Sequence, residues 1–198
     1  MNAPTSPLDP SRSSYYVTDA LYRELTENFS GWQDDAYAVT DAAVRDEFRR
    51  LLEREARFLD QLRYDDWLAM YAAECVYWVP STPKAGDPRR EIALMFDDRR
   101  RLEDRIYRMR TGFAWSQAPA SRTVRLVTNV EVFSTVRDDA RMVRSNFLIS
   151  EFWGDETRQL TGWAAHRVVR DHAGWKIQAK QVNLIECDQP IRNPSIVL

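Results

Sequence analysis

The strongest constraint on the fold is a set of four long segments in the second half of the chain, in which apolar and polar residues tend to alternate. They span residues 122–136, 141–153, 157–170 and 175–186. A period of two is typical of β-strands. The breaks between them contain aspartate and glycine, which favour turns. Because these connections are short, the sequence predicts an antiparallel meander.

The segments before these strands are expected to contain helices. Residues 41–62 carry apolar side chains at helical spacing, and Thr40 or Asp41 can cap that helix. We further predict a short helix at 65–71, a strand at 75–79 that ends at Pro80, a loop at 81–90, and a segment at 91–96 that fits a strand or a helix. Helices followed by strands indicate the α+β class, with one strongly curved, mostly antiparallel sheet and the N-terminal helices packed in its concave face.

One residue does not fit the apolar face of the helix at 41–62. Glu55 lies four residues after Leu51 and four before Leu59, in the middle of that face. A buried carboxylate needs a partner. We expect an arginine or a backbone donor to supply it, and we favour a paired core glutamate over a catalytic acid.

The first 40 residues are expected to form a partly mobile tail or arm, followed by one domain at 41–198. Residues 1–16 are rich in proline and serine. Residues 17–40 fit either a short helix from Thr18 to Phe29 or an arm that wraps a neighbour. No run approaches the roughly 20 apolar residues of a membrane span. The two cysteines are too few for a secreted disulfide scaffold, so we expect a cytoplasmic protein.

An arginine-rich segment connects the two halves of the chain. Eight arginines lie between Arg99 and Arg125, interleaved with acids. We predict a helix that begins at Asp97 or Asp98 and stops at Gly112. Its buried stripe is predicted to be Leu102, Ile106 and Met109, and its i,i+4 ion pairs Arg100–Asp104 and Asp104–Arg108.

This segment could be an ordinary solvated helix face or a docking surface. The net charge of −2 and the interleaved acids argue against nucleic-acid binding. Arginine together with aromatic residues is enriched in protein interfaces, which favours docking. The apolar segment 193–198 is also expected to be tucked in or docked. The interface candidates are Arg99, Arg101, Arg105, Arg108, Arg110, Trp115, Arg122 and Leu198.

A search for catalytic or metal-binding patterns finds little. The two histidines, His166 and His172, are separated by roughly 20 Å if the chain between them is extended. They therefore do not form a metal site together, and Cys75 and Cys187 do not start a Rieske ligand pair. Nucleophile-elbow, P-loop and dinucleotide motifs are missing. One enzymatic alternative remains, an isomerase, dehydratase or small-ligand binder with His166 in a cone-shaped pocket. Its possible helpers are Tyr71, Tyr77, Tyr107 and Asp66.

Several short sequences, in this order, carry a resemblance to a known family. They are Glu55-Ala-Arg-Phe-Leu-Asp60, Val76-Tyr-Trp-Val-Pro80, Phe96-Asp-Asp-Arg99, Arg108-Met-Arg-Thr-Gly-Phe-Ala-Trp115, Pro119-Ala-Ser-Arg-Thr123, Val143-Arg-Ser-Asn-Phe147, Gly174-Trp-Lys-Ile177 and Asn193-Pro-Ser-Ile196. Over residues 42–198 the chain resembles the small (beta) subunit of Rieske-type aromatic-ring-hydroxylating dioxygenases. The resemblance implies a cystatin-like or NTF2-like cone.

The same resemblance implies a division of labour between subunits. The usual assembly has three large and three small subunits. The large (alpha) subunit carries the Rieske [2Fe–2S] cluster, the mononuclear Fe(II) and the aromatic substrate, and NAD(P)H supplies electrons through a separate reductase. The small subunit would then be a non-catalytic, structural partner with no cofactor of its own, bound to neither nucleic acid nor membrane.

Two departures from the family pattern limit what can be transferred. The chain has Val124 and Arg125 in Thr-Val-Arg-Leu-Val, where many relatives read Thr-Arg-His-Leu-Val. Residues 1–40 are longer than usual and lie outside the resemblance. The identity of the aromatic substrate, and whether one or two oxygen atoms are added, stay open.

Overall fold

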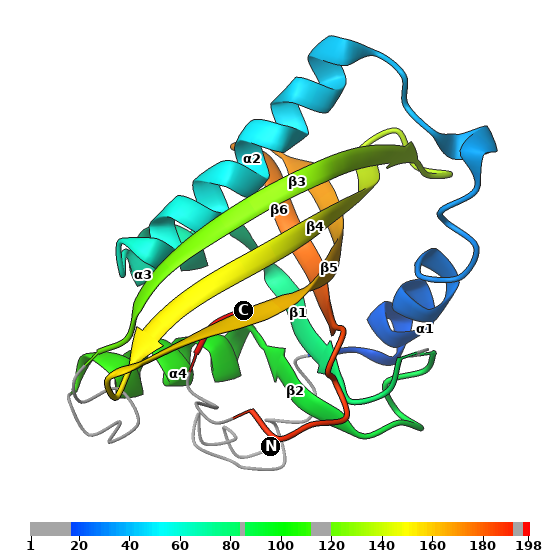
Figure 1. Cartoon of the computed structure of the whole chain (residues 1–198). Coiled ribbons are helices and arrows are strands. Elements are labelled where there is room, and N and C mark those ends of the chain that lie inside the picture. The colour runs from blue at the N-terminus through cyan, green and yellow to red at the C-terminus, as the bar shows by residue number, and fades with distance from the viewer. Residues whose placement is uncertain (1–16, 84–85, 112–119, 192–195) are drawn as a thin grey trace.

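The structure is a computed structural model that describes residues 17–83, 86–111, 120–191 and 196–198. Four α-helices and six strands make up the regular structure of these residues (Figure 1). The helices are α1 (Asp19–Asn28), α2 (Ala42–Asp60), α3 (Tyr64–Leu68) and α4 (Arg99–Arg110), with a short 3-10 turn η2 (Asp35–Tyr37) after α1. The strands are β1 (Tyr71–Pro80), β2 (Ala93–Asp98), β3 (Arg122–Ser134), β4 (Ala140–Trp153), β5 (Glu156–Asp171) and β6 (Gly174–Leu184).

The six strands form one sheet in the order β2-β1-β6-β5-β4-β3. All neighbouring pairs are antiparallel except β1 and β6. The predicted meander from β3 to β6 is therefore confirmed, and its four strands lie within a few residues of the predicted ranges. The segment at 91–96 is a strand from Ala93 onward, since β2 pairs with β1. The α+β class and the mostly antiparallel, curved sheet are confirmed as well (Figure 1).

Local irregularities in the strands accompany the curvature of the sheet. The β3–β4 register shifts between Thr128 and Glu131, where Asn129 has a φ of 51°. A bulge of this kind bends the strand and increases its twist. In β5, Gly162 allows the backbones of β5 and β6 to approach closely. A Cβ atom at this position would lie 2.1 Å from the backbone oxygen of Asn183 on β6.

Helix α2 packs in the concave face, as predicted. Asp41 caps its first turn by accepting hydrogen bonds from the amides of Ala43 and Val44. Its apolar face meets inward side chains of four strands. The main core includes Phe48, Leu52, Leu59, Val132, Val143, Ile149, Val168, Ile177 and Val182. Helix α3 is also confirmed, although Tyr71, which was expected in it, begins β1.

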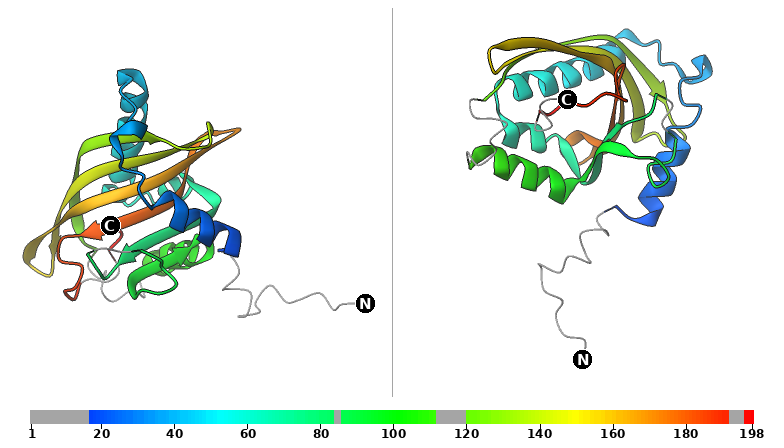
Figure 2. Two further views of the ribbon diagram at one scale, coloured as in Figure 1. Left: turned by 90° about the vertical axis from the view of Figure 1, so that its right-hand side faces the viewer. Right: turned by 60° about the horizontal axis from the view of Figure 1, so that its bottom comes forward.

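Residues 17–40 pack on the outer face of the same sheet, which Figure 2 shows from two further directions. The short-helix interpretation of 17–40 is confirmed by α1, which Thr18 caps through the amide of Leu21. The apolar contacts of this segment form two clusters. One joins Val17, Leu21 and Leu25 to Val76, Trp78 and Ala179, and the other joins Trp32 to Phe133, Met142 and Ala165.

The segment continues to the free edge of β3. The amide of Val39 donates to the carbonyl of Val132, with 2.8 Å between nitrogen and oxygen. No helix within the described ranges is both long and apolar enough to cross a membrane.

An ion pair connects α1 to the outer face. The guanidinium of Arg167 on β5 is 1% exposed and is paired with Glu24. Burial lowers the pKa of Arg167, and the nearby Glu24 carboxylate opposes this effect. We expect Glu24→Gln to lower the free energy of unfolding by about 1–3 kcal/mol, because a buried cation loses its charged partner.

This prediction can be checked by urea unfolding of the variant. Glu27→Gln is the matched control, since Glu27 is an exposed residue on the same helix, and we expect it to change stability by less than about 0.5 kcal/mol. Equal effects of the two substitutions would contradict the assignment of Glu24 as the anchor of α1.

Candidate functional site

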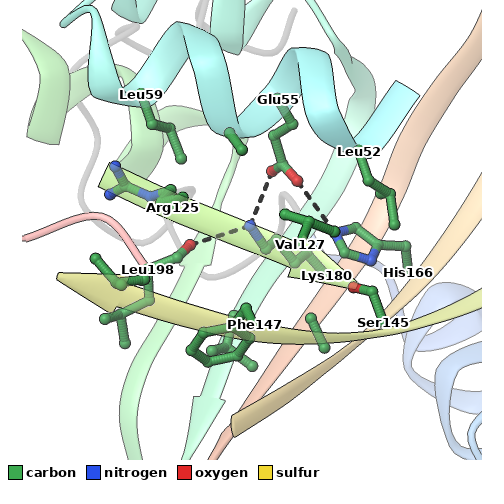
Figure 3. Close-up of a pocket in the computed structure, with 14 residues that line it drawn as sticks. Leu52, Glu55, Leu59, Arg125, Val127, Ser145, Phe147, His166, Lys180 and Leu198 are labelled. Carbon is green, nitrogen blue, oxygen red and sulfur yellow. Dashed lines mark hydrogen bonds and ion pairs between the residues drawn. The ribbon is translucent and has the colours of Figure 1, made fainter. Parts of the chain in front are cut away.

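The interior of the cone contains a small cavity with a polar group of side chains (Figure 3). Its volume is about 30 Å³. That volume accommodates one or two water molecules, whereas binding sites for organic ligands usually measure about 300–1,000 Å³. The residues that line it are Leu52, Glu55, Ala56, Leu59, Arg125, Val127, Ser145, Phe147, Ile149, Ala164, His166, Lys180, Val182 and Leu198.

Glu55 is the centre of the polar group. Its Oε1 atom accepts hydrogen bonds from Lys180 Nζ at 2.9 Å, Trp67 Nε1 at 3.1 Å and the Tyr71 hydroxyl at 3.1 Å. Its Oε2 atom lies 3.2 Å from His166 Nε2. The expected partner was an arginine or a backbone donor, and this prediction is wrong. The favoured interpretation of Glu55 as a paired core glutamate is confirmed.

The four partners of Glu55 come from four different elements, none of which is its own helix. Glu55 projects inward from α2, Trp67 comes from α3, and Tyr71 begins β1. His166 and Lys180 are directly opposite each other on β5 and β6, so their side chains lie on the same concave face. Lys180 was not predicted as a partner of Glu55. The available signal was a lysine in an apolar strand, at a position where the alternating pattern requires an inward side chain.

The cluster shifts the pKa values of its members. Burial alone would raise the pKa of the Glu55 carboxyl, but Lys180 and His166 outweigh burial and the pKa lies well below its usual range. Burial lowers the pKa of His166, and the Glu55 carboxylate offsets this only in part. Burial also lowers the pKa of Lys180, against the opposing effect of Glu55. The structure therefore favours an ionised Glu55–Lys180 pair beside a neutral imidazole.

The neutral imidazole has a defined tautomer. An ionised Glu55 only accepts hydrogen bonds, so His166 Nε2 carries the proton and donates it. The Nδ1 atom is then an acceptor, and it is buried without a hydrogen-bond partner among the described residues. His166 lies on a strand, as predicted, and faces the cavity. The side chains around it leave no room for an organic substrate.

The C-terminal residues close this group of side chains. The hydroxyl of Tyr77 donates to the main-chain oxygen of Leu198 at 2.8 Å, and Lys180 Nζ donates to the same oxygen at 3.0 Å. Leu198 is 3% exposed, so it is buried in the core of its own chain. The expectation that segment 193–198 is tucked in holds for 196–198, and 192–195 lie outside the described residues.

A second polar group joins α2, β3 and the C-terminal segment. The carboxylate of Asp60 accepts hydrogen bonds from the Thr123 hydroxyl at 2.8 Å and from the backbone amide of Arg125 at 2.9 Å. The Arg125 guanidinium is paired with the same carboxylate and also donates to the main-chain oxygen of Val197. Two of the sequence motifs that carry the family resemblance, those ending at Asp60 and at Thr123, therefore meet in this group, beside the C-terminal segment.

Helix α4, which contains six arginines, lies in the lower part of the view in Figure 1. The helix is capped by Asp98, whose side chain accepts a hydrogen bond from the amide of Arg101. Asp98 is one of the two residues predicted to begin this helix. Leu102 and Ile106 are buried and Met109 is partly buried. Neither predicted i,i+4 pair, Arg100–Asp104 or Asp104–Arg108, occurs among the ion pairs of the described residues. These two pairings are wrong.

Most predicted interface residues on α4 have partners within the chain. Arg99 pairs with Glu103 and donates to the backbone of Leu68, and Arg105 pairs with Asp97 on β2. Arg101 donates to the carbonyl of Phe96. Arg110 pairs with Asp65, and Arg108 is exposed. The Cζ atom of Arg122 lies 4.6 Å from the ring centroid of Phe152. Two predictions, the interface residue Trp115 and the helix stop at Gly112, fall outside the described residues.

The described residues offer no metal centre. No group of three or more His, Cys, Asp or Glu side chains in the described ranges is placed to hold a metal ion. His166 faces the cavity from β5, whereas His172 is exposed in the turn between β5 and β6. The described histidines and cysteines are not arranged to ligate a Rieske cluster or a mononuclear iron.

Comparison with known proteins decides the family. The family model described as "Ring hydroxylating beta subunit" matches residues 54–189. This chain belongs to that family. The matched range begins in α2 and ends after β6, so it includes the whole sheet and the buried Glu55 group.

Individual relatives of the chain support its assignment to this beta subunit family. The chain is 34% identical to the benzoate 1,2-dioxygenase subunit beta of Acinetobacter baylyi, over 76% of this chain and 91% of that protein. It is 31% identical to the small oxygenase component of the p-cumate 2,3-dioxygenase system of Pseudomonas putida, over 84% and 91%. The crystal structure of the benzoate 1,2-dioxygenase beta subunit from Burkholderia mallei superposes with a TM-score of 0.62 and 26% identity, over 80% of this chain and 99% of that one.

The family assignment agrees with the fold and with the function expected from the sequence. The cone is the NTF2-like fold of these beta subunits. Members of the family are subunits of oxidoreductase complexes that hydroxylate aromatic rings.

The buried ion pair makes a testable contribution to stability. We expect Glu55→Gln to lower the free energy of unfolding by about 3–5 kcal/mol, because Lys180 then lacks a charged partner in the core. Adding Lys180→Met to the same chain should restore part of that loss. Chemical denaturation of both variants checks this. The control is Glu53→Gln, which removes an exposed partner of Arg49 and should cost less than about 1 kcal/mol.

The lowered pKa of His166 predicts how stability depends on pH. Below the unfolded-state pKa of about 6.5, the unfolded chain binds a proton that the folded chain does not take up. Stability should therefore fall as the pH drops below about 6.5, with a further loss below about 4.5 from Glu55, whose folded pKa is also lowered.

This pH dependence can be assigned by substitution. His166→Gln keeps a donor for Glu55 but does not titrate, so its free energy of unfolding should fall less between about pH 7.5 and about pH 5.5 than that of the unsubstituted chain. His172→Gln, in the exposed turn, should keep the original pH dependence. Identical profiles for all three proteins would contradict the assignment.

Proposed function

We propose that this chain is the non-catalytic small subunit of a Rieske non-haem iron oxygenase that hydroxylates aromatic compounds during their degradation. The observation that carries the proposal is the family match over residues 54–189, together with relatives that are named as dioxygenase beta or small subunits. The interior of the cone agrees with this role, because an ion pair and apolar side chains fill it and stabilise the sheet.

The proposed assembly contains three catalytic large (alpha) subunits and three copies of this chain. In it the large subunit holds the [2Fe–2S] cluster and the mononuclear Fe(II), and a separate reductase delivers electrons from NAD(P)H. This part of the proposal rests on the family resemblance. The residues of this chain would support the folding and stability of the large subunit and would not touch the reacting atoms.

Helix α4 is the proposed docking element for the large subunit. It contains six arginines and two acids, whereas the whole chain has a net charge of −2. Arg99, Arg105 and Arg110 are balanced by acids within the chain. The outward part of the helix adds Arg108, and Tyr107 with 69% of its surface exposed. Tyrosine and arginine are common anchors in interfaces, and an acidic patch on the large subunit would complement them.

The alternative function, a stand-alone isomerase, dehydratase or small-ligand binder, is less well supported. It requires a substrate next to His166, and the cavity there measures about 30 Å³. The nearest possible helpers are already engaged, since Tyr71 donates to Glu55 and Tyr77 donates to Leu198. Tyr107 and Asp66 are exposed residues on helices and do not line the cavity.

Co-expression tests the proposed function directly. The chain should co-purify with a Rieske large subunit encoded beside it, and the yield and ring-hydroxylating activity of that large subunit should drop when this chain is omitted. A large subunit that assembles and turns over equally well alone would contradict the proposal.

Charge reversal tests the docking element. Neither Arg100 nor Arg108 has an ion pair among the described residues, so Arg100→Glu/Arg108→Glu should leave the fold intact. It should weaken binding of the large subunit by about tenfold or more, with a changed salt dependence. Arg54→Glu/Arg57→Glu makes the same change on exposed positions of α2 and should bind normally. Titration of labelled chain with large subunit measures both, and equal loss would assign the effect to net charge alone.

A further inference from the structure

An open groove lies between helix α2 and the turn that joins β5 to β6. Its volume is about 590 Å³, which is within the range of about 300–1,000 Å³ that is usual for sites that bind organic molecules. Helix α2 forms one wall, and residues 66–70 and 170–176 form the others. The groove shares no lining residue with the small cavity around Glu55, so it is a separate feature of the molecule.

Part of the groove is apolar and aromatic. Among its lining residues, Leu51 and Met70 are buried, and Phe58 and Trp175 are partly buried. The ring of Trp175 packs against the buried Phe48, with 5.0 Å between the ring centroids, so the core fixes its position. An aromatic ring that is held by the core and also lines a groove provides a stacking surface for a planar ligand.

Two of the charged side chains in the groove are balanced by neighbours. Arg50 pairs with Asp46 on the same helix, with 2.8 Å between nitrogen and oxygen. Asp66 pairs with Arg63, also at 2.8 Å. Neither Arg50 nor Asp66 therefore adds an uncompensated charge to the groove.

The other charged side chains leave an excess of positive charge. Arg54, Arg170 and Lys176 line the groove and form no ion pair with the residues that the structure describes. Lys176 Nζ donates to the carbonyl oxygen of Ala69 at 2.8 Å, which positions the ammonium group but does not neutralise it. Glu47 is the remaining carboxylate among the described lining residues. Three cations and one anion make an anion the complementary ligand.

The positive charge lies next to the aromatic surface. Arg170 and Trp175 are opposite each other on β5 and β6, and the Cζ atom of Arg170 lies over the Trp175 ring, 5.7 Å from its centroid. Arg54 lines the same groove from α2. A carboxylate matches the guanidinium because its two oxygens can accept from two parallel N–H groups. An aromatic body attached to that carboxylate would lie beside the Trp175 ring.

We propose that this groove is a binding site for a small aromatic carboxylate. The ring of the ligand packs on Trp175 and Phe58, and its carboxylate is held by Arg54, Arg170 and Lys176. The proposal goes beyond the subunit function proposed above and does not depend on it, because these residues lie outside α4 and the binding can be measured on the full chain alone.

The direct test titrates the full, 15N-labelled chain with 2-naphthoate and follows the indole N–H signals by NMR. The Trp175 signal, identified by its loss in Trp175→Phe, should shift in a saturable manner, whereas the signals of the buried Trp67 and Trp78 should not. 2-Naphthamide has the same rings without the charge, and acetate has the charge without the rings. Both should bind at least about tenfold more weakly than 2-naphthoate.

Substitution of the cations tests their role in binding. Arg54→Gln/Arg170→Gln should weaken 2-naphthoate binding by about tenfold or more and leave 2-naphthamide binding unchanged. Arg57→Gln is the matched control, because it removes an exposed arginine of α2 that does not line the groove, and it should keep the original affinity. Arg54→Gln alone gives a second measurement if the double variant does not fold, and should weaken binding by about threefold.

A separate titration distinguishes this site from a contact between subunits. Arg54→Gln/Arg170→Gln should bind the large subunit as tightly as the unsubstituted chain does. Weaker binding of the large subunit would identify the groove as a protein contact and overturn the proposal. Equal binding of 2-naphthoate and 2-naphthamide, or an equal 2-naphthoate affinity of the arginine variants and the Arg57→Gln control, would overturn it as well.

Discussion

The ion pair between Glu55 and Lys180 is the interaction on which the interior of this cone depends. Both charges lie in a core where neither could remain alone, so α2 and β6 are held in one relative position. Trp67, Tyr71 and His166 use the remaining hydrogen-bonding capacity of the carboxylate, which connects α3, β1 and β5 to the same point. The result is a filled interior in a fold whose shape could enclose a ligand, and this favours a structural role over a catalytic one.

Much of the architecture could be predicted from the sequence because the signals are local. Alternation of apolar residues gave β3 to β6, helical spacing and Asp41 gave α2, and Asp98 gave the start of α4. The apolar face of α2 also indicated that Glu55 would be buried and paired. Each of these inferences uses residues within a few positions of one another, so no knowledge of the tertiary arrangement was needed.

The identities of partners could not be predicted in the same way, because they depend on long-range register. Lys180 and Glu55 are 125 residues apart in sequence. They meet only because β6 pairs with β5 in the sheet. Arg105 turns toward Asp97 rather than toward the acids on its own helix, because β2 runs directly before α4. The packing of α1 on the outer face is a further example, since Leu21 and Leu25 could have covered any apolar surface.

The way in which the edge of β3 is covered affects how readily the free subunit aggregates. A free edge strand exposes amides and carbonyls that can pair with another molecule and start aggregation. Here the Asp60 carboxylate occupies the amide of Arg125, and the amide of Val39 occupies the carbonyl of Val132. The groups that block the edge come from α2 and from the segment after α1, so they are in place as soon as the chain folds. The folded subunit therefore has a reduced risk of strand-to-strand association before it is assembled.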